Sequence, residues 1–143
     1  MITMYIDGGS RGNPGPAGYG VRIEDANGEV VERFSGSVGI ATNNVAEYRG
    51  LLAALEWAAD RGHRQVHVRS DSELLVRQMK GEYRVKNSGL QPLHAAARAL
   101  IGRIGQVTFE HVRREANRDA DLLANEAMDA AASAAPSAGP NLS

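Results

Sequence analysis

The sequence contains no cysteine, only one tryptophan and two phenylalanines, and no long apolar run. Without cysteine, disulfide scaffolds and thiolate metal sites are excluded, and a cytoplasmic location is compatible with this composition. No segment has the length of a membrane-spanning helix, and the N-terminus lacks the charged-then-apolar pattern of a signal peptide. We therefore expect a cytoplasmic protein with no membrane partner.

Neither sign of charge is in clear excess: the chain has 16 basic and 17 acidic residues, for a net charge of -1. A generic polyanion binder is excluded, so any contact with nucleic acid must depend on a local basic patch. The 143 residues, 43% of them hydrophobic, suit one ordinary domain, which we place over residues 1–129. Residues 130–143 read AAASAAPSAGPNLS, which predicts either a free tail or a linker to a further domain.

Hydrophobic periodicity predicts nine elements in the order β-β-β-α-β-α-α-β-α. The first strand covers residues 2–7, and an antiparallel hairpin covers roughly 18–25 and 29–36, joined by Asn27-Gly28 in a predicted type I′ turn. A long helix begins near Asn43 or Asn44, either of which can cap it, and ends at Gly62. The remaining elements lie in HRQVHVRSD (strand), SELLVRQMKG (helix), residues 90–104 (helix), QVTFEHV (strand) and NRDADLLANEAMDAA (helix). We expect an α/β fold: a mixed five-stranded sheet, three antiparallel strands then parallel ones, with helices on both faces.

Four acidic residues occupy places where such a sheet gathers functional groups. Asp7 and Asp71 each end a predicted strand, while Glu47 and Asp121 lie near helix starts, on or beside the apolar face. Groups beyond strand ends near a change in strand order commonly form a site. Each acid alone is more simply read as a cap or a helix-dipole partner. Together they predict a carboxylate cluster that needs a cation.

Carboxylates without cysteine, and without histidine at ligand spacing, favour Mg²⁺ or Mn²⁺ over zinc. A pair of such ions can hold a phosphodiester for in-line attack by water. The acid pattern therefore indicates phosphodiester hydrolysis.

Five ordered blocks carry these acids and their neighbours: DGGSRGNPGPAGYG, TNNVAEYRGLLAAL, SDSELLVRQMKG, VKNSGLQPL and NRDADLLANEA. In this order they resemble type 1 ribonuclease H (ribonuclease HI), in the subgroup without a basic protrusion, over about residues 2–128. The resemblance implies a ribonuclease H-like fold and a two-metal endonuclease that cuts the RNA strand of RNA–DNA hybrids, leaving 5′-phosphate and 3′-hydroxyl ends. It also implies two Mg²⁺ ions, with Mn²⁺ as a substitute, and a monomer that takes hybrids and, as a further candidate, double-stranded RNA.

The resemblance assigns residue roles as well. The catalytic and metal-binding acids would be Asp7, which bridges both ions, Glu47, Asp71 and Asp121; the rival Asp119 is read as a solvated acid of the first helical turn. The substrate-binding candidates are Gly8, Gly9, Ser10, Arg11, Asn13, Thr42, Asn43, Asn44, Ser72 and Asn87. Among these, the glycine-rich backbone, Asn43 and Asn44 would read ribose 2′-hydroxyls, and Thr42 with Asn87 would hold a phosphate of the DNA strand.

Three features depart from the family pattern. Glu73 stands where many members have glutamine, which puts one minor-groove contact in doubt. The basic protrusion is missing, which predicts weak and strongly salt-sensitive hybrid binding. The loop before the last helix has no histidine after His111, itself expected to end a strand and to be structural; Arg114 or Glu115 is the candidate for the loop role.

Competing functions stay open at this stage. The main alternative is a non-catalytic nucleic-acid-binding module on the same fold, although all four acids are present. A nucleotide-gripping ATPase domain lacks its phosphate-loop motif. A 3′–5′ exonuclease with related acids is a further alternative, but the TNN block argues against it.

Overall fold

The computed structural model describes residues 1–134 and contains one mixed sheet of five strands, in the order β3-β2-β1-β4-β5. The elements follow one another along the chain as β1 (Ile2–Ser10), β2 (Gly15–Glu24), β3 (Val30–Ala41), α1 (Asn43–Asp60), β4 (Gln65–Ser70), α2 (Glu73–Met79), α3 (Gln91–Ile104), β5 (Gln106–His111), a 3₁₀ turn η1 (Arg114–Asn117) and α4 (Arg118–Ala134). The predicted fold class and element order are confirmed.

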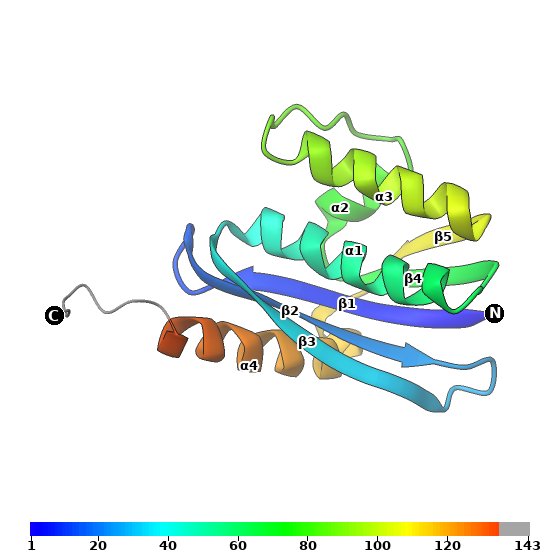
Figure 1. Cartoon of the computed structure of the whole chain (residues 1–143), viewed down its shortest axis with the longest axis horizontal. Coiled ribbons are helices and arrows are strands. Elements are labelled where there is room, and N and C mark those ends of the chain that lie inside the picture. The colour runs from blue at the N-terminus through cyan, green and yellow to red at the C-terminus, as the bar shows by residue number, and fades with distance from the viewer. Residues whose placement is uncertain (135–143) are drawn as a thin grey trace, which may run out of the picture.

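The sheet changes direction at its central strand. β1 pairs antiparallel with β2 and parallel with β4, and β4 pairs parallel with β5. Helices α1, α2 and α3 lie on one side of the sheet and α4 lies on the other (Figure 1). Because β1, β4 and β5 run in the same direction, their carboxyl ends meet at one edge.

A core of aliphatic side chains holds α1 to the sheet. Met4, Val68, Leu51 and Leu55 are all fully buried, and the two leucines are spaced four apart on one face of α1. Each such side chain stabilises the fold by about 1.5–3 kcal/mol on burial. The core thus holds α1 against the sheet, near the edge that carries the acids.

The β2–β3 connection differs from the predicted type I′ turn. The amide of Gly28 donates to the carbonyl of Asp25 at 3.0 Å, and the amide of Asp25 donates to the carbonyl of Glu29 at 2.9 Å. Gly28 has a positive φ of 81°, but Asn27 does not, so the mirror-image turn is absent. The Asp25 carboxylate also accepts from the amides of Asn27 and Glu29, which explains why a three-residue loop is preferred here.

Two helix ends also differ from expectation. Thr42, and neither asparagine, caps α1: its hydroxyl accepts from the amide of Val45 at 3.2 Å. α4 continues to Ala134, into the segment predicted as tail, because Ala131 still packs against the body. The rest of that segment, 135–143, lies outside the described residues. Within residues 1–134, no helix is both long and apolar enough to cross a membrane.

Candidate active site

The carboxyl ends of β1 and β4 bring three acids together. Asp7 lies in β1 near its end, Asp71 follows β4, and Glu47 lies in the second turn of α1. One carboxylate oxygen from each of the three lies within 4.8 Å of the others. Asp7 is buried, with 8% of its surface exposed, while Glu47 and Asp71 are partly exposed.

The glycine after Asp7 sets the distance to Glu47. A Cβ on Gly8 would lie 2.5 Å from the carbonyl carbon of Ala46 and 2.6 Å from the amide nitrogen of Glu47. No real Cβ tolerates such contacts, so only glycine lets α1 approach β1 this closely. The glycine-rich segment therefore serves mainly helix packing, and most of it is strand: Gly8 and Gly9 belong to β1, and Gly15 and Gly18 to β2.

A second glycine, Gly20, lets the start of α4, which carries Asp121, pack closely on the opposite face of the sheet. Gly20 pairs with Asp7 across the β1–β2 ladder, and a Cβ there would lie 2.3 Å from the carbonyl oxygen of Ala120. α4 therefore begins directly against the strand pair that carries Asp7. Asp121 contributes to raising the pKa of Asp7, but it is not one of the three acids whose carboxylate oxygens converge within 4.8 Å.

Crowding of the acids disfavours their ionised forms. Burial, followed by the charges of Asp71 and Glu47, raises the pKa of Asp7 to about 9. Burial and the charge of Asp71 raise the pKa of Glu47 to about 8. At neutral pH such a cluster is electrostatically costly unless it takes up protons or a cation.

The donor set suits a hard divalent cation. All converging ligand atoms are carboxylate oxygens, and the Oε2 atom of Glu47 is buried without a hydrogen-bond partner. A buried, unpaired carboxylate oxygen is costly unless an ion or water satisfies it. The residues present therefore fit a magnesium- or manganese-type ion.

The acids open into a groove of about 550 Å³. Its described lining consists of Asn43, Asn44, Glu47, Asp71, Ser72, His111, Val112, Arg113, Arg114 and Glu115. Amide and hydroxyl groups thus flank the acids on the α1 side, and two arginines flank them on the β5 side. The structure places Asn44, Ser72, Arg114 and Glu115, all singled out from sequence, along this one groove.

The β1–β2 connection is tied to the start of α1 through Asn43. The Oδ1 atom of Asn43 accepts from the backbone amide of Ser10 at 2.8 Å. The backbone amide of Asn43 donates to Oδ1 of Asn13 at 3.0 Å. Gly9 lies beside the same Oδ1 atom, since a Cβ there would be 3.6 Å away. These contacts give one continuous polar surface next to the acids.

The remaining candidates lie further out and have protein partners. Arg11 pairs with Asp129 at 2.9 Å. Asn87 accepts from the amide of Gly89 at 2.7 Å in the loop before α3, and Thr42 is the α1 cap. Glu73 is engaged by Arg77 at 2.9 Å. None of these four is among the residues that line the acid groove.

Two readings of individual residues need correction. Asp119 is not a solvated acid: its side chain is 20% exposed and is gripped by Arg33, which lowers its pKa. His111 does end β5, but it is exposed and lines the groove instead of packing.

Arg113 and the fully buried Asn117 were missed from sequence. In the structure, the parallel register of Ser70 with His111 places the residues after β5 beside Asp71. Had this register been predicted, it would have pointed to the loop after β5.

Comparison with known proteins gives a consistent picture. Residues 5–127 match the family model described as reverse transcriptase-like. A bifunctional protein of Mycobacterium tuberculosis is 48% identical over 135 residues, covering 94% of this chain and 37% of that protein. Ribonuclease HI of Halobacterium salinarum is 42% identical over 128 residues, covering 90% of this chain and 64% of that enzyme. The chain thus spans well under two thirds of the mycobacterial relative.

Solved structures agree. The N-terminal ribonuclease H domain of a Mycobacterium tuberculosis protein superposes with a TM-score of 0.89 at 47% identity, covering 92% of this chain and 96% of that one. A ribonuclease H1 in complex with an RNA/DNA hybrid superposes with a TM-score of 0.87 at 46% identity, covering 92% of this chain and 99% of that one.

Proposed function

Since this chain belongs to the ribonuclease H-like family, we propose that it is a metal-dependent endoribonuclease that cuts the RNA strand of RNA–DNA hybrids. The observation that carries the proposal is the convergence of Asp7, Glu47 and Asp71 within 4.8 Å, with Glu47 and Asp71 lining an open groove. A similar ribonuclease H1 has been solved with an RNA/DNA hybrid, which supports the choice of substrate. The proposed products carry 5′-phosphate and 3′-hydroxyl ends.

Asp7, Glu47, Asp71 and Asp121 are the residues that would hold the divalent cations, two Mg²⁺ in this proposal, with Mn²⁺ as a substitute. Such ions would activate water as a nucleophile and stabilise the charge that develops on the phosphate. The chain's own contribution is to supply four fixed carboxylates. The buried core fixes α1 and the strands, and with them Asp7, Glu47 and Asp71.

Discrimination of RNA from DNA is assigned to the polar surface beside the acids. An RNA strand in a hybrid presents 2′-hydroxyls along a wide minor groove. Asn43, Asn44 and Ser72 offer hydrogen-bonding groups beside the acids, and the backbone of Gly8 and Gly9 adds more without bulky side chains. We assign to these groups the contacts with ribose.

Phosphate contacts are assigned to two arginines of the groove and to two residues outside it. Arg113 and Arg114 line it on the β5 side, where they can pair with backbone phosphates. Glu115 is an auxiliary residue of the same loop. Thr42 and Asn87 would take a phosphate of the DNA strand on the far side of α1.

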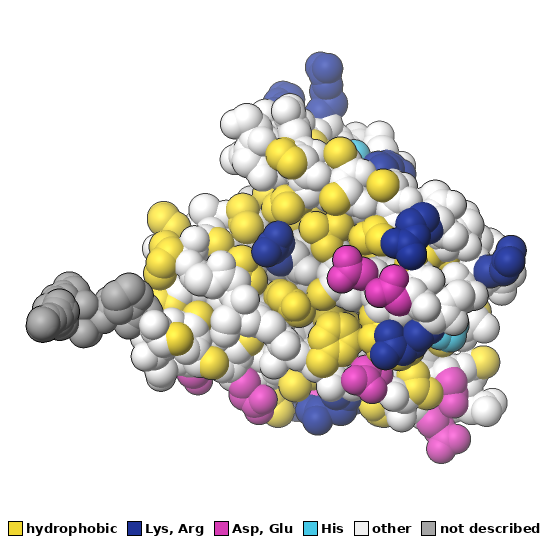
Figure 2. Space-filling view, in the orientation of Figure 1, with side chains coloured by type: hydrophobic (Ala, Val, Ile, Leu, Met, Phe, Trp, Pro, Cys, Tyr) yellow, Lys and Arg dark blue, Asp and Glu magenta, His cyan; other side chains and the backbone are white. Residues whose placement is uncertain are grey.

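Basic and acidic side chains are interspersed over the face drawn in Figure 2, so the molecule offers no broad cationic surface there. We assign the main cationic contacts to Arg113 and Arg114, which line the groove. A cytoplasmic location and a monomeric domain complete the proposal. The chain after α4 would lead on to a further domain, as the greater length of the mycobacterial relative suggests.

The test is a panel of labelled substrates incubated with Mg²⁺: an RNA–DNA hybrid, single-stranded RNA, double-stranded RNA and double-stranded DNA. We expect metal-dependent cuts inside the RNA strand of the hybrid and none in double-stranded DNA. Binding of the hybrid without any cut would instead favour the non-catalytic binding module.

A further inference from the structure

We propose that Asp119 and Asn117 are positioning residues that set Asp121 against Asp7 by fixing the first turn of α4 to the sheet. The proposal rests on the proposed function, because it concerns the same acid centre. Asp119 and Asn117 lie two and four residues before Asp121. Neither lines the acid groove, so any effect on the reaction must pass through Asp121 or through the loop before it.

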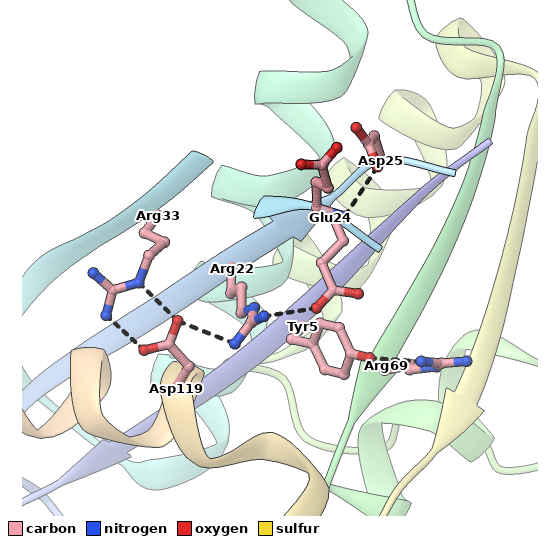
Figure 3. A network of polar contacts seen from close by, with 8 residues as sticks. Tyr5, Arg22, Glu24, Asp25, Arg33, Arg69 and Asp119 are labelled. Carbon is pink, nitrogen blue, oxygen red and sulfur yellow. Dashed lines mark hydrogen bonds and ion pairs between the residues drawn. The ribbon is translucent and has the colours of Figure 1, made fainter. Parts of the chain in front are cut away.

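Asp119 joins α4 to the outer strands of the sheet. The Nε atom of Arg33, on β3, donates to Oδ2 of Asp119 at 2.7 Å, and the Nη2 atom donates to Oδ1 at 2.5 Å. The Nη1 atom of Arg22, on β2, lies 3.6 Å from Oδ2. Figure 3 shows Asp119 held between the two arginines, with Glu24 on the other side of Arg22. A two-point arginine contact fixes direction as well as distance.

Asn117 joins the same turn to the catalytic strand. Its Nδ2 atom donates to the carbonyl of Ile6 at 2.8 Å, and the residue is 1% exposed. Ile6 directly precedes Asp7. A companion contact ties the other end of the loop, since the amide of Val112 donates to the carbonyl of Ser70, directly before Asp71, at 2.9 Å. The loop from β5 to α4 is thus fixed next to both strand-end aspartates.

Packing alone does not hold this end of α4. On one side Gly20 allows close contact, but on the other side an open pocket of about 210 Å³ lies beside the helix start. Its lining is Tyr5, Arg22 and Glu24 from the sheet and residues 115–120 from the loop and helix. The first turn therefore has room to shift when the polar contacts are cut.

The matched variants separate positioning from general stability. Asp119→Asn keeps the shape and removes the charge, while Arg33→Met cuts the contact and leaves Asp119 at the helix start. Arg33→Lys keeps a positive charge but not the two-point contact, so it should restore function only in part. Asp60→Asn is the control: it removes an exposed pair with Arg103, 3.4 Å long, that involves none of the groove residues.

The readouts are kcat and KM on a hybrid, the Mg²⁺ concentration for half-maximal rate, and the rise in Tm that Mg²⁺ causes without substrate. We expect Asp119→Asn and Arg33→Met to need about tenfold more Mg²⁺ and to lose about tenfold in kcat, with KM near wild type. The Mg²⁺-induced rise in Tm should shrink in both variants and stay unchanged in Asp60→Asn.

A lower Tm combined with wild-type kcat and a wild-type Mg²⁺ response would show a purely structural role and overturn the proposal. A wild-type chain that binds Mg²⁺ but does not cut hybrids would remove the proposed function, while the Tm comparison would still decide the positioning role. If Mg²⁺ does not raise the Tm of the wild-type chain, the positioning role is overturned too.

Discussion

Gly8 and Ala46 are in backbone contact across the interface of β1 and α1, so close that a Cβ on Gly8 would lie 2.5 Å from the Ala46 carbonyl. This contact brings Glu47, the next residue of α1, to Asp7, the residue before Gly8. The geometry of the acid cluster and the packing of α1 are therefore fixed by the same pair of residues.

Gly8→Ala should accordingly damage both stability and the acid centre. Because the obstructing atoms are backbone, α1 must move away, and we expect a loss of about 3 kcal/mol in the free energy of unfolding. Chemical denaturation measures this loss, and the Mg²⁺-induced rise in Tm should shrink as well. The control is Gly102→Ala, where a Cβ meets nothing within 4 Å in α3; it should stabilise by about 1 kcal/mol. A Gly8→Ala protein as stable as wild type would contradict the packing argument.

The repulsion among the acids predicts an unusual effect of pH on the metal-free protein. The raised pKa of Asp7, about 9, means that the folded state binds more protons than the unfolded chain between about pH 4 and 9. This term therefore lowers stability as pH rises through that window. Thermal unfolding in chelator should give Asp7→Asn a higher Tm than wild type, with the gap widening toward alkaline pH.

Added Mg²⁺ should reverse that order, because wild type keeps all its ligands. A Tm of Asp7→Asn below that of wild type throughout the pH series in chelator would show that the acids do not repel each other.

Asp121 and Asp119 should differ in the size of their effects on turnover. Asp121→Asn removes a carboxylate at the acid centre itself, whereas Asp119→Asn acts only by displacing it. We therefore expect a far larger loss of kcat for Asp121→Asn than the roughly tenfold loss for Asp119→Asn. Steady-state kinetics on a hybrid at saturating Mg²⁺ compares the two directly, and equal losses would show that the assignment of Asp121 is wrong.

Substrate binding should weaken as salt rises, with a slope set by the number of arginines that contact phosphates. The hybrid is a polyanion, and each phosphate contact adds about one to the slope of log KM against log salt. Replacing Arg113 or Arg114 with glutamine should lower the slope by about 1 in each case. Arg103→Gln, in α3 and outside the groove, should leave it unchanged. A KM that does not vary between about 50 and 200 mM salt would contradict the account.

Much of the fold could be predicted from sequence because its signals are local. Alternating strands, the stripe in α1 and the strand-end positions of Asp7 and Asp71 depend only on nearby residues. The β2–β3 turn was predicted wrongly because the Asp25 side chain competes for the amides that a tighter turn would use. The α1 cap was misplaced by one residue because three adjacent polar residues, Thr42, Asn43 and Asn44, are all able to cap.

The parts that sequence could not supply depend on contacts between distant segments. Gly8 was predicted to bring its backbone close to a ribose, which stays a prediction, but its close contact with Ala46 of α1 could not be foreseen. Asp119 was predicted to be solvated because Arg33 is 86 residues away in the chain. Asn117 has no pattern of its own, and its role follows only from its burial beside Ile6. Such relationships need the packed structure.

The most direct test of the central claim is single-turnover cleavage of an end-labelled RNA–DNA hybrid by wild type and Asp7→Asn, with and without Mg²⁺. We expect internal cuts in the RNA strand by wild type with Mg²⁺, products that carry 5′-phosphates, and no cuts without metal or by Asp7→Asn. Cleavage that persists at the wild-type rate in Asp7→Asn, or a hybrid left intact by wild type with Mg²⁺, would contradict the central claim.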